Sequence, residues 1–317
     1  KNIDIHLDLT KLLTKHIAIL AKSGAGKSYT VGVLIEEIID KKVPILIIDP
    51  HGEYTSLKLP NTEEKELLAE YGLKPKGFSN IQIYGDAKIN PELKPLRLNN
   101  NLSPSEILHL IPGKLSNTQT GILYSALKHI DTINFTNVLH ELDKEENNTK
   151  WTIINNLEYI NNLGIFTDGF TAYNELIQPG RCTIINLKGV SPDVQEIIVY
   201  KLVKDLFELR KKEKIPPFFT IIEEAHGYCP ERSFGETRCS KILRTVASEG
   251  RKFGLGLCVI SQRPARVDKS VLSQCTTQII LKITNPNDIK AVYNSVEGLT
   301  SESQDEIKNL SIGTAIV

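Results

Sequence analysis

The chain has 317 residues, enough for one large α/β domain or two small ones at the usual scale of about 150 residues per domain. Apolar residues make up 40% of it, and 20 glycines with 15 prolines are too few for a collagen-like or low-complexity chain. Basic and acidic residues balance at 38 each, which excludes a polybasic protein that coats nucleic acid by bulk charge. The longest apolar runs fall far below the ~20 residues of a membrane helix, so we expect no membrane partner.

The cysteine content indicates a reducing, cytoplasmic environment. The number of cysteines is odd and no CxxC pair occurs, so we interpret them as small buried hydrophobic residues: Cys182, Cys229, Cys239, Cys258 and Cys275. The chain contains no Met, even at position 1, and stops on the strand-like Ala315-Ile-Val317. We therefore expect a piece of a longer protein.

Short β-like runs alternate with helical patterns, which predicts an α/β fold with a mostly parallel central sheet covered on both faces. The expected strands are His16–Leu20, Pro44–Asp49, Ile81–Tyr84, Cys182–Leu187, Phe218–Ile222, Gly256–Ser261, Gln278–Ile283 and Gly313–Val317. One amphipathic helix follows the first strand, and another runs from about Ser191 to Arg210, with Pro192 at its first position. Residues from about 99 to 180 are polar and helical in pattern, with a capping box at Ser103-x-x-Glu106, and predict a helical insertion on the sheet domain.

The strongest motif follows the first strand. Ala21-Lys-Ser-Gly-Ala-Gly-Lys-Ser28 matches the phosphate-binding pattern G-x-x-x-x-G-K-S/T, with Ala21 in place of the first glycine. The glycines allow backbone N–H groups to surround phosphates, and the following helix adds positive partial charge at its N-terminus. We expect Lys27 to reach the β- and γ-phosphates of ATP and Ser28 to bind Mg²⁺. The nucleotide-binding candidates are Ser23, Gly24, Ala25, Gly26, Lys27, Ser28 and Tyr29.

An acidic pair ends a later apolar strand, Phe218-Phe-Thr-Ile-Ile-Glu-Glu224. A phosphate-binding loop needs one acid on a neighbouring strand for Mg²⁺ and a second to orient the attacking water, so we assign the metal role to Glu223 and the general-base role to Glu224. Glutamate is unusual at the first position, where aspartate is commoner. The alternative is a pair of solvated acids at a strand end.

Further polar residues follow two other strands. Gln262 follows the strand Gly256–Ser261 and is our candidate sensor of the γ-phosphate, because in the additional-strand P-loop ATPases such a strand lies between the phosphate-loop strand and the acidic strand. The alternative is a plain turn from strand to loop. Asp49 ends the second strand, in Asp49-Pro-His-Gly-Glu-Tyr54, and is a candidate to join the nucleotide site. His51 and Glu53 either belong to the same cluster or serve as structural caps.

A candidate arginine finger lies in the sequence between the acidic pair Glu223-Glu224 and the sensor candidate Gln262. Arg251 follows a glycine at an expected helix end and is a candidate arginine finger for a neighbouring subunit. The alternative is an arginine that caps helix carbonyls. Arg244 is the competing finger candidate.

Several of these motifs together resemble the HerA ATPases, of the HerA/FtsK group of DNA-pumping motors. The resemblance spans nearly the whole chain in order and is weakest over about residues 60–150. The motifs that carry it are Asp49–Tyr54, Glu223-Glu-Ala-His226, Glu249–Gly254, Ser261-Gln-Arg-Pro264, Val271–Cys275 and Asn285-Pro-Asn-Asp288.

This resemblance implies a RecA-like P-loop core, a homo-hexamer and ATP-driven translocation on double-stranded DNA, with a NurA-type nuclease or another effector as partner in end resection or defence. Family members carry an N-terminal β-barrel domain, which we expect to be absent here. Loops facing the ring centre would contact DNA, and our candidates are the segments Arg232–Lys241 and Arg263–Lys269. Their basic residues are Arg232, Arg238, Lys241, Arg263, Arg266 and Lys269.

Two alternative functions would require the same nucleotide site. One alternative is a nucleotide-gated ring scaffold that activates a nuclease or effector without sustained pumping, and another is a conjugation-type ATPase, which shares the Asp49–Glu53 type of run. A small-molecule kinase fits poorly, because no lid for an acceptor substrate is evident.

Overall fold

The computed structural model describes residues 6, 8–296 and 299–317, which form two compact units. Unit 1 comprises Lys1–Pro95 and Tyr173–Val317, and unit 2 comprises Leu96–Ala172. The helical insertion expected at about 99–180 overlaps unit 2.

Unit 1 is built on a parallel sheet with the strand order β10-β1-β9-β8-β2-β7-β3-β4. The expected mostly parallel α/β sheet is confirmed. The order also places β9 between β1 and β8, as expected for the strand that precedes the sensor candidate Gln262. The strands are β1 Ile17–Leu20, β2 Ile45–Asp49, β3 Ile81–Gly85, β4 Lys94–Pro95, β7 Cys182–Asn186, β8 Phe218–Ile222, β9 Leu255–Ser261 and β10 Thr277–Ile280.

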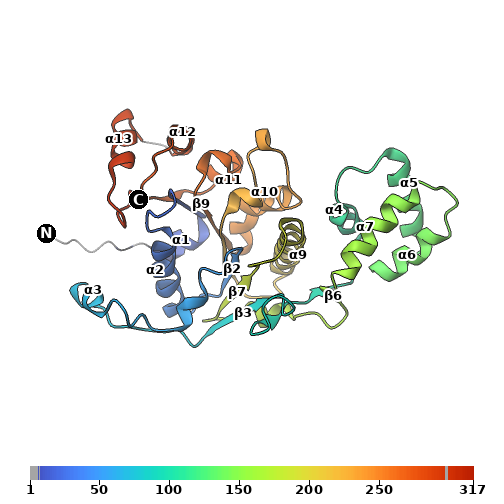
Figure 1. Cartoon of the computed structure of the whole chain (residues 1–317), viewed down its shortest axis with the longest axis horizontal. Coiled ribbons are helices and arrows are strands. Elements are labelled where there is room, and N and C mark those ends of the chain that lie inside the picture. Colours follow the sequence, from blue (N-terminus) through green and yellow to red (C-terminus); the bar gives the residue numbers. More distant parts are fainter. Residues whose placement is uncertain (1–5, 7, 297–298) are drawn as a thin grey trace. The chain divides into compact units, whose positions relative to one another are not determined.

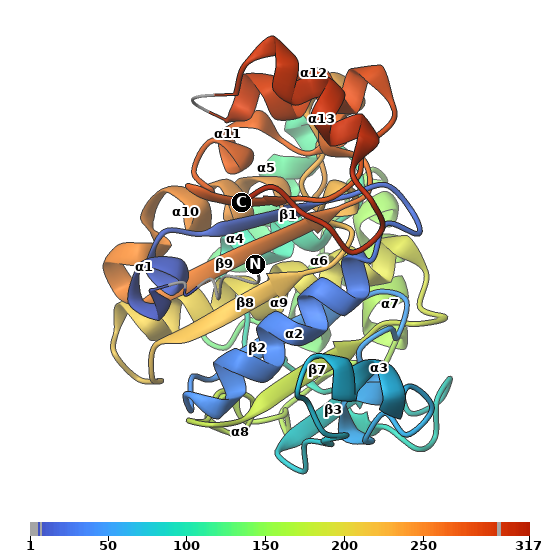
Figure 2. The ribbon, with the colours of Figure 1, turned by 90° about the vertical axis from the view of Figure 1, so that its left-hand side faces the viewer.

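The central strands are buried on both faces, because successive side chains of a strand point to opposite sides of the sheet and both sides are covered. Every residue of β1, β2, β7, β8 and β9 is buried. One face packs against α2 (Lys27–Asp40), which contributes Val31, Ile35 and Ile38 to the core and crosses the strands in Figure 2. Because all these strands are parallel, their C-terminal ends meet at one edge of the sheet, where ligands bind in open α/β folds.

The expected strand Gly313–Val317 is wrong. This segment makes a single antiparallel bridge, between Ile316 and Ile280. Gly313 adopts a positive φ of 76°, and its N–H donates to the Ala25 carbonyl at 3.1 Å. The segment therefore turns against the phosphate loop instead of extending the sheet, and the regular part of β10 ends at Ile280.

Helices connect the strands of unit 1 (Figures 1 and 2). The helix expected from Ser191 is α9, Pro192–Lys211, with proline at its first position. The other α-helices are α1 Leu9–Thr14, α3 Lys65–Glu70, α8 Tyr173–Leu176, α10 Ser240–Glu249, α11 Lys269–Leu272, α12 Pro286–Ser295 and α13 Ser301–Asn309. Short 3-10 turns occur at Thr55–Lys58, Ala225–Gly227, Arg232–Phe234, Gly250–Phe253 and Pro264–Arg266.

Unit 2 is mainly helical. Its helices are α4 Pro104–Leu110, α5 Asn117–Lys128, α6 Phe135–Asp143 and α7 Lys150–Asn162, and a two-stranded sheet joins β5 Leu98–Asn99 to β6 Phe166–Thr167. The capping box expected at Ser103 is present: its side chain accepts from the Glu106 amide, and Glu106 accepts from the Ser103 amide. Ser116 and Asn134 likewise cap the starts of α5 and α6, each side chain accepting from a backbone amide of the first turn.

The interpretation of the five cysteines as buried hydrophobic residues is confirmed, since all are free and buried. Burial raises the pKa of every one of their thiols. Within the described ranges, no helix has both the length and the apolar character needed to cross a bilayer.

Candidate nucleotide-binding and hydrolysis site

The phosphate loop connects the end of β1 to the start of α2. Gly24 and Gly26 have φ values of 74° and 96°, which glycine adopts without strain, and a Cβ on Gly26 would lie 3.3 Å from the Gly313 nitrogen. Ala21, the residue that departs from the motif, is completely buried, so this position requires a small side chain and not a glycine. Ser23 and Gly24 are exposed, so the loop presents its backbone to solvent.

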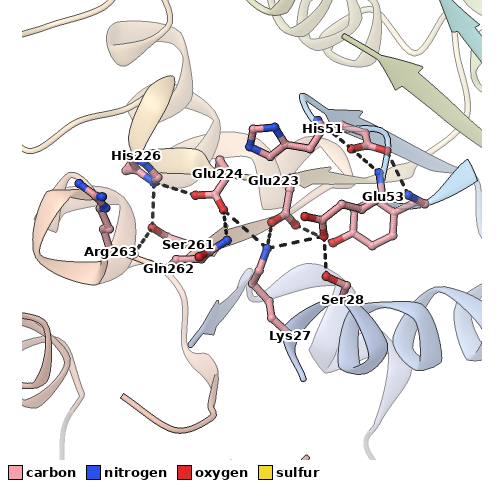
Figure 3. A network of polar contacts seen from close by, with 12 residues as sticks. Lys27, Ser28, His51, Glu53, Glu223, Glu224, His226, Ser261, Gln262 and Arg263 are labelled. Carbon is pink, nitrogen blue, oxygen red and sulfur yellow. Dashed lines mark hydrogen bonds and ion pairs between the residues drawn. The ribbon is translucent and has the colours of Figure 1, made fainter. Parts of the chain in front are cut away.

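Lys27 lies among three carboxylates. Its Nζ forms an ion pair with Glu223 and lies 3.7 Å from Glu224 Oε1 and 4.0 Å from Glu53 Oε2. Figure 3 shows these side chains converging on the ammonium group from separate segments. Glu223 is fully buried and Lys27 is 6% exposed. One ammonium group balances only one of the three negative charges, so the site favours additional positive charge.

The loop after β2 delivers two side chains to this cluster. Both oxygens of Asp49 accept hydrogen bonds from backbone amides of His51–Tyr54, at 2.7 to 3.3 Å. Asp49 therefore shapes the loop, and the side chains of this segment that reach the cluster belong to Glu53 and Tyr54. Glu53 accepts from the Ser28 hydroxyl at 2.5 Å, and the Tyr54 hydroxyl donates to Glu223 Oε2 at 2.6 Å. Glu53 was expected either in the cluster or as a structural cap, and its contact with Ser28 places it in the cluster. The side chain of His51 is exposed, and its backbone amide donates to Asp49.

Burial raises the pKa of Asp49 above its usual range, against the opposing effect of the four amide hydrogen bonds. The carboxyl group is fully enclosed in the fold, with no exposed surface. Asp49 is thus a positioning residue for the Glu53–Tyr54 pair.

Glu224 is held at both oxygens. Gln262 Nε2 donates to Oε1 at 2.7 Å, and His226 Nδ1 lies 3.1 Å from Oε2. The φ of Glu224 is 50°, a left-handed value that is rare outside glycine and that occurs at functional sites. Burial alone would raise the pKa of this carboxyl, but the hydrogen bonds from His226 and Gln262 and the charge of Lys27 outweigh burial and lower it. Glu224 is therefore ionised at neutral pH, as a water-orienting base must be.

The oxygen donors fit a Mg²⁺ ion bound together with a nucleotide. Ser28, Glu53 and Glu223 supply hydroxyl and carboxylate oxygens, which this ion prefers. Together with Glu224, the carboxylates around Lys27 exceed it by two charges. Among the described residues, no group of three or more His, Cys, Asp or Glu side chains forms a complete protein cage for a metal. Mg²⁺ in phosphate-loop sites keeps waters and phosphate oxygens as ligands, so a full cage is not required.

Arg251 lies far from the phosphate loop of its own chain. It belongs to the 3-10 turn Gly250–Phe253, directly before β9, and is exposed. The phosphate loop follows the opposite end of the neighbouring, parallel β1. The seven residues of β9 span roughly 20 Å at about 3.3 Å per residue. Arg251 can therefore serve such a site only from a second copy of the chain.

Arg244 is engaged within its own chain. Its guanidinium group donates to Asp268 at 2.8 Å and to Glu236 at 2.7 Å, and Asp268 is 1% exposed. An arginine finger must be free to reach a neighbour's phosphate. Arg244 therefore fits the finger role less well than Arg251.

The two basic segments lie side by side. Pro230 and Val267 form an antiparallel bridge, and the Glu231 amide donates to the Arg266 carbonyl at 2.8 Å. Arg238 differs from the other basic residues, because it is only 14% exposed and pairs with Glu196 at 3.4 Å. The remaining basic side chains are exposed: Arg232, Lys241, Arg263, Arg266 and Lys269.

Three contributors were missed by reasoning from the sequence. Tyr54 touches Glu223, His226 touches Glu224, and Ser261 lies 3.2 Å from His226. Tyr54 and His226 both occur inside motifs that carry the family resemblance, which was the available signal. The signal for Ser261 was its position at the end of β9, one residue before the sensor candidate Gln262, because polar residues at strand ends lie near the site.

Known proteins resemble this chain over its whole length. Residues 1–206 match the sequence model of the family described as Helicase HerA, central domain. The DNA double-strand break repair helicase HerA of Sulfolobus acidocaldarius is 30% identical over 334 residues, covering 100% of this chain and 64% of that protein. A probable helicase of Methanocaldococcus jannaschii is 30% identical over 350 residues, covering 100% of this chain and 62% of its own length. The chain thus spans slightly less than two thirds of these relatives.

Solved structures show the same fold. VirB4 of Thermoanaerobacter pseudethanolicus superposes with a TM-score of 0.64 at 16% identity, over 94% of this chain and 85% of that one. The bacterial conjugative coupling protein TrwB, in a form named TrwBdeltaN70, gives a TM-score of 0.60 at 12% identity, over 96% and 82% of the two chains. The match of residues 1–206 to the family model shows that the chain belongs to the HerA helicase family and contains its central domain.

Proposed function

We propose that the chain binds and hydrolyses ATP and that hydrolysis drives movement on double-stranded DNA. The observation that carries this proposal is the meeting of Lys27, Glu223 and Glu224 at the phosphate loop, with Glu53 and Gln262 beside them. The relatives named helicases support DNA as the substrate.

Each residue has a distinct chemical role in this proposal. Backbone amides of the loop and Lys27 bind the phosphates, and Lys27 balances charge that develops on the γ-phosphate. Ser28, Glu53 and Glu223 hold a Mg²⁺ ion, which supplies charge neutralisation on the phosphates when bound. Glu224 accepts a proton from the attacking water, and Gln262 fixes the carboxylate that does so.

The site works between subunits of a homo-hexamer in this proposal. Arg251 lies at the opposite edge of the sheet from the phosphate loop, so a neighbouring copy would supply it to the γ-phosphate, and hydrolysis would loosen that interface. The exposed basic residues of the Arg232–Lys241 and Arg263–Lys269 segments would contact the DNA backbone, and a NurA-type nuclease or another effector would be the protein partner. The chain has no net charge, so DNA binding would depend on these few residues and weaken steeply with salt.

Steady-state ATP turnover, measured with and without duplex DNA, tests the proposal. Lys27→Ala should abolish turnover, and Glu224→Gln should retain nucleotide while losing about 10²-fold or more in kcat. Lys41→Ala is the matched control, because Lys41 is an exposed lysine at the other end of α2. Turnover by Lys27→Ala equal to that of Lys41→Ala would contradict the site. Turnover that duplex DNA leaves unchanged would favour a nucleotide-gated scaffold over a motor.

An experiment with mixed variant subunits tests whether Arg251 acts as an arginine finger in a neighbouring subunit. Subunits carrying Arg251→Ala and subunits carrying Glu224→Gln are each expected to be inactive alone. Mixed together they should regain turnover, since some interfaces then combine an intact phosphate loop with an intact arginine. The absence of recovery at every mixing ratio would contradict action between subunits.

A further inference from the structure

His226 makes contacts that its place in the chain does not require. It lies in the short 3-10 turn Ala225–Gly227, just after β8. Its Nδ1 is 3.1 Å from Glu224 Oε2 and 3.2 Å from Ser261 Oγ, as Figure 3 shows. An ionised carboxylate only accepts hydrogen bonds, so Nδ1 carries a proton and donates to Glu224. The imidazole thus connects the end of β8 to the end of β9.

The residues at the end of β9 control both oxygens of Glu224. Gln262 donates directly to Oε1, and the single Nδ1–H of His226 is shared between Glu224 Oε2 and Ser261 Oγ, both of which accept from it. Ser261 is fully buried, and its hydroxyl accepts from the Arg263 amide at 3.0 Å. A displacement of the chain at Arg263 would therefore disturb two hydrogen-bond paths to the same carboxylate.

The Arg263–Lys269 segment, which follows Ser261 and Gln262, exposes cationic side chains to solvent. Arg263, Arg266 and Lys269 are exposed, and the Arg266 guanidinium lies 5.1 Å from the centre of the exposed Phe234 ring. Exposed cations beside an aromatic ring suit a polyanionic phosphate backbone and carry no base specificity. The surface is also tied to the chain that follows Glu224, through the bridge of Val267 with Pro230.

We propose that His226 is a positioning residue that fixes the Glu224 carboxylate and links its orientation to the Arg263–Lys269 segment. This inference rests on the proposed ATPase function and adds its regulation: a polyanion bound to the segment changes the rate of hydrolysis through this histidine. The physical basis is that a general base acts only when aligned, and a misplacement of about 1 Å costs on the order of 10²-fold in rate.

Four variants of the 317-residue chain test the link. His226→Phe removes the donor and keeps the ring, while His226→Asn keeps a donor near the Nδ1 position. Ser261→Ala removes the hydroxyl that lies against His226 and that accepts from the Arg263 amide, and it leaves His226 and Glu224 unchanged. His140→Phe is the control, because His140 is an exposed histidine in α6 of unit 2. For each variant, kcat and KM for ATP are measured with and without a blunt duplex DNA, and the melting temperature is recorded.

His226→Phe should lower kcat by roughly 10-fold or more, leave KM within about twofold and abolish stimulation by DNA. His226→Asn should recover most of the unstimulated kcat, and Ser261→Ala should lose more of the DNA-stimulated kcat than of the unstimulated kcat. Normal stimulation in His226→Phe, or wild-type turnover that ignores DNA, would overturn the link. Equal losses in the Asn and Phe variants, with equal falls in melting temperature, would also overturn it by showing a merely structural role.

Failure of the underlying function gives a different pattern. If the wild type hydrolyses no ATP, or Lys27→Ala hydrolyses it normally, the proposed function itself is wrong. If turnover depends on Lys27 while the His226 variants behave like His140→Phe, only the present inference is wrong.

Discussion

Replacing Lys27 by Met should destabilise the protein even in the absence of nucleotide. Lys27 is 6% exposed and pairs with Glu223, which is fully buried. The substitution leaves the Glu223 carboxylate buried with one remaining donor, the Tyr54 hydroxyl at 2.6 Å. Removing one partner of a buried ion pair costs about 3–5 kcal/mol, and the retained Tyr54 hydrogen bond places the expected loss near the lower end, at about 3 kcal/mol.

The loss is large enough to measure by thermal or urea unfolding. For a unit the size of unit 1, about 1 kcal/mol shifts the melting temperature by about 2–4 °C, so Lys27→Met should lower it by about 6–12 °C. Far-UV circular dichroism at neutral pH, with EDTA present and ATP absent, follows the transition without contributions from ligand binding.

Two further variants separate charge from packing. Adding Glu223→Gln to Lys27→Met neutralises the unpaired carboxylate and should recover most of the lost stability, since removing both charges of a buried pair is often neutral. Lys76→Met breaks a surface ion pair with Asp40 whose side chains are 52% and 54% exposed, so it should cost about 1 kcal/mol or less. A Lys27→Met protein that melts with the wild type, or a double variant no more stable than the single one, would refute this reasoning.

Other residues of unit 1 give three shorter predictions. Tyr54→Phe removes the donor to Glu223 and should lower the affinity for Mg²⁺-ATP more than that for ATP in EDTA, as titration calorimetry would show; equal losses would contradict it. Asp49→Ala leaves four loop amides without their acceptor and should cost about 2 kcal/mol or more in urea unfolding; an unchanged midpoint would argue against the capping role. Burial lowers the pKa of His16, and the nearby Arg251 adds to the effect, so the unfolded chain binds the extra proton first and stability should fall as pH drops below about 6.5. His16→Asn should flatten this fall between pH 7 and 5, and a wild-type profile without the fall would contradict it.

Much of the site was accessible to sequence reasoning because its chemistry is local. The phosphate loop lies between a strand and a helix, and its glycines, Lys27 and Ser28 form one continuous motif. Glu223 and Glu224 follow directly after an apolar strand, as Gln262 does after another. In a parallel sheet all such positions face one edge, so their meeting could be predicted before the neighbouring strands were known.

Errors arose where a segment's partner lies far along the chain. Gly313–Val317 has strand-like residues, yet the segment turns at Gly313 and makes one bridge, because the phosphate loop provides a competing backbone partner in Ala25. The nucleotide-site role expected for Asp49 stays a prediction, and the structure adds that its carboxylate accepts hydrogen bonds from four amides of the loop that follows it. Residue type and strand-like pattern could not reveal the competing partner of the Gly313–Val317 segment, because it lies almost 290 positions away, at Ala25.

The amino-acid sequence alone determined the α/β class and the family, together with the phosphate loop, the acidic pair and the sensor candidate. Each of these depends on periodicity or on a short contiguous motif. The tertiary structure decided which loops touch at the edge of the sheet. It brought Tyr54 to Glu223 across 169 positions and His226 to Ser261 across 35, and it placed Arg251 at the opposite edge. The physical reason is that burial patterns specify which face of a strand is covered, whereas contacts between loops depend on the lateral order of strands, which non-local pairing sets.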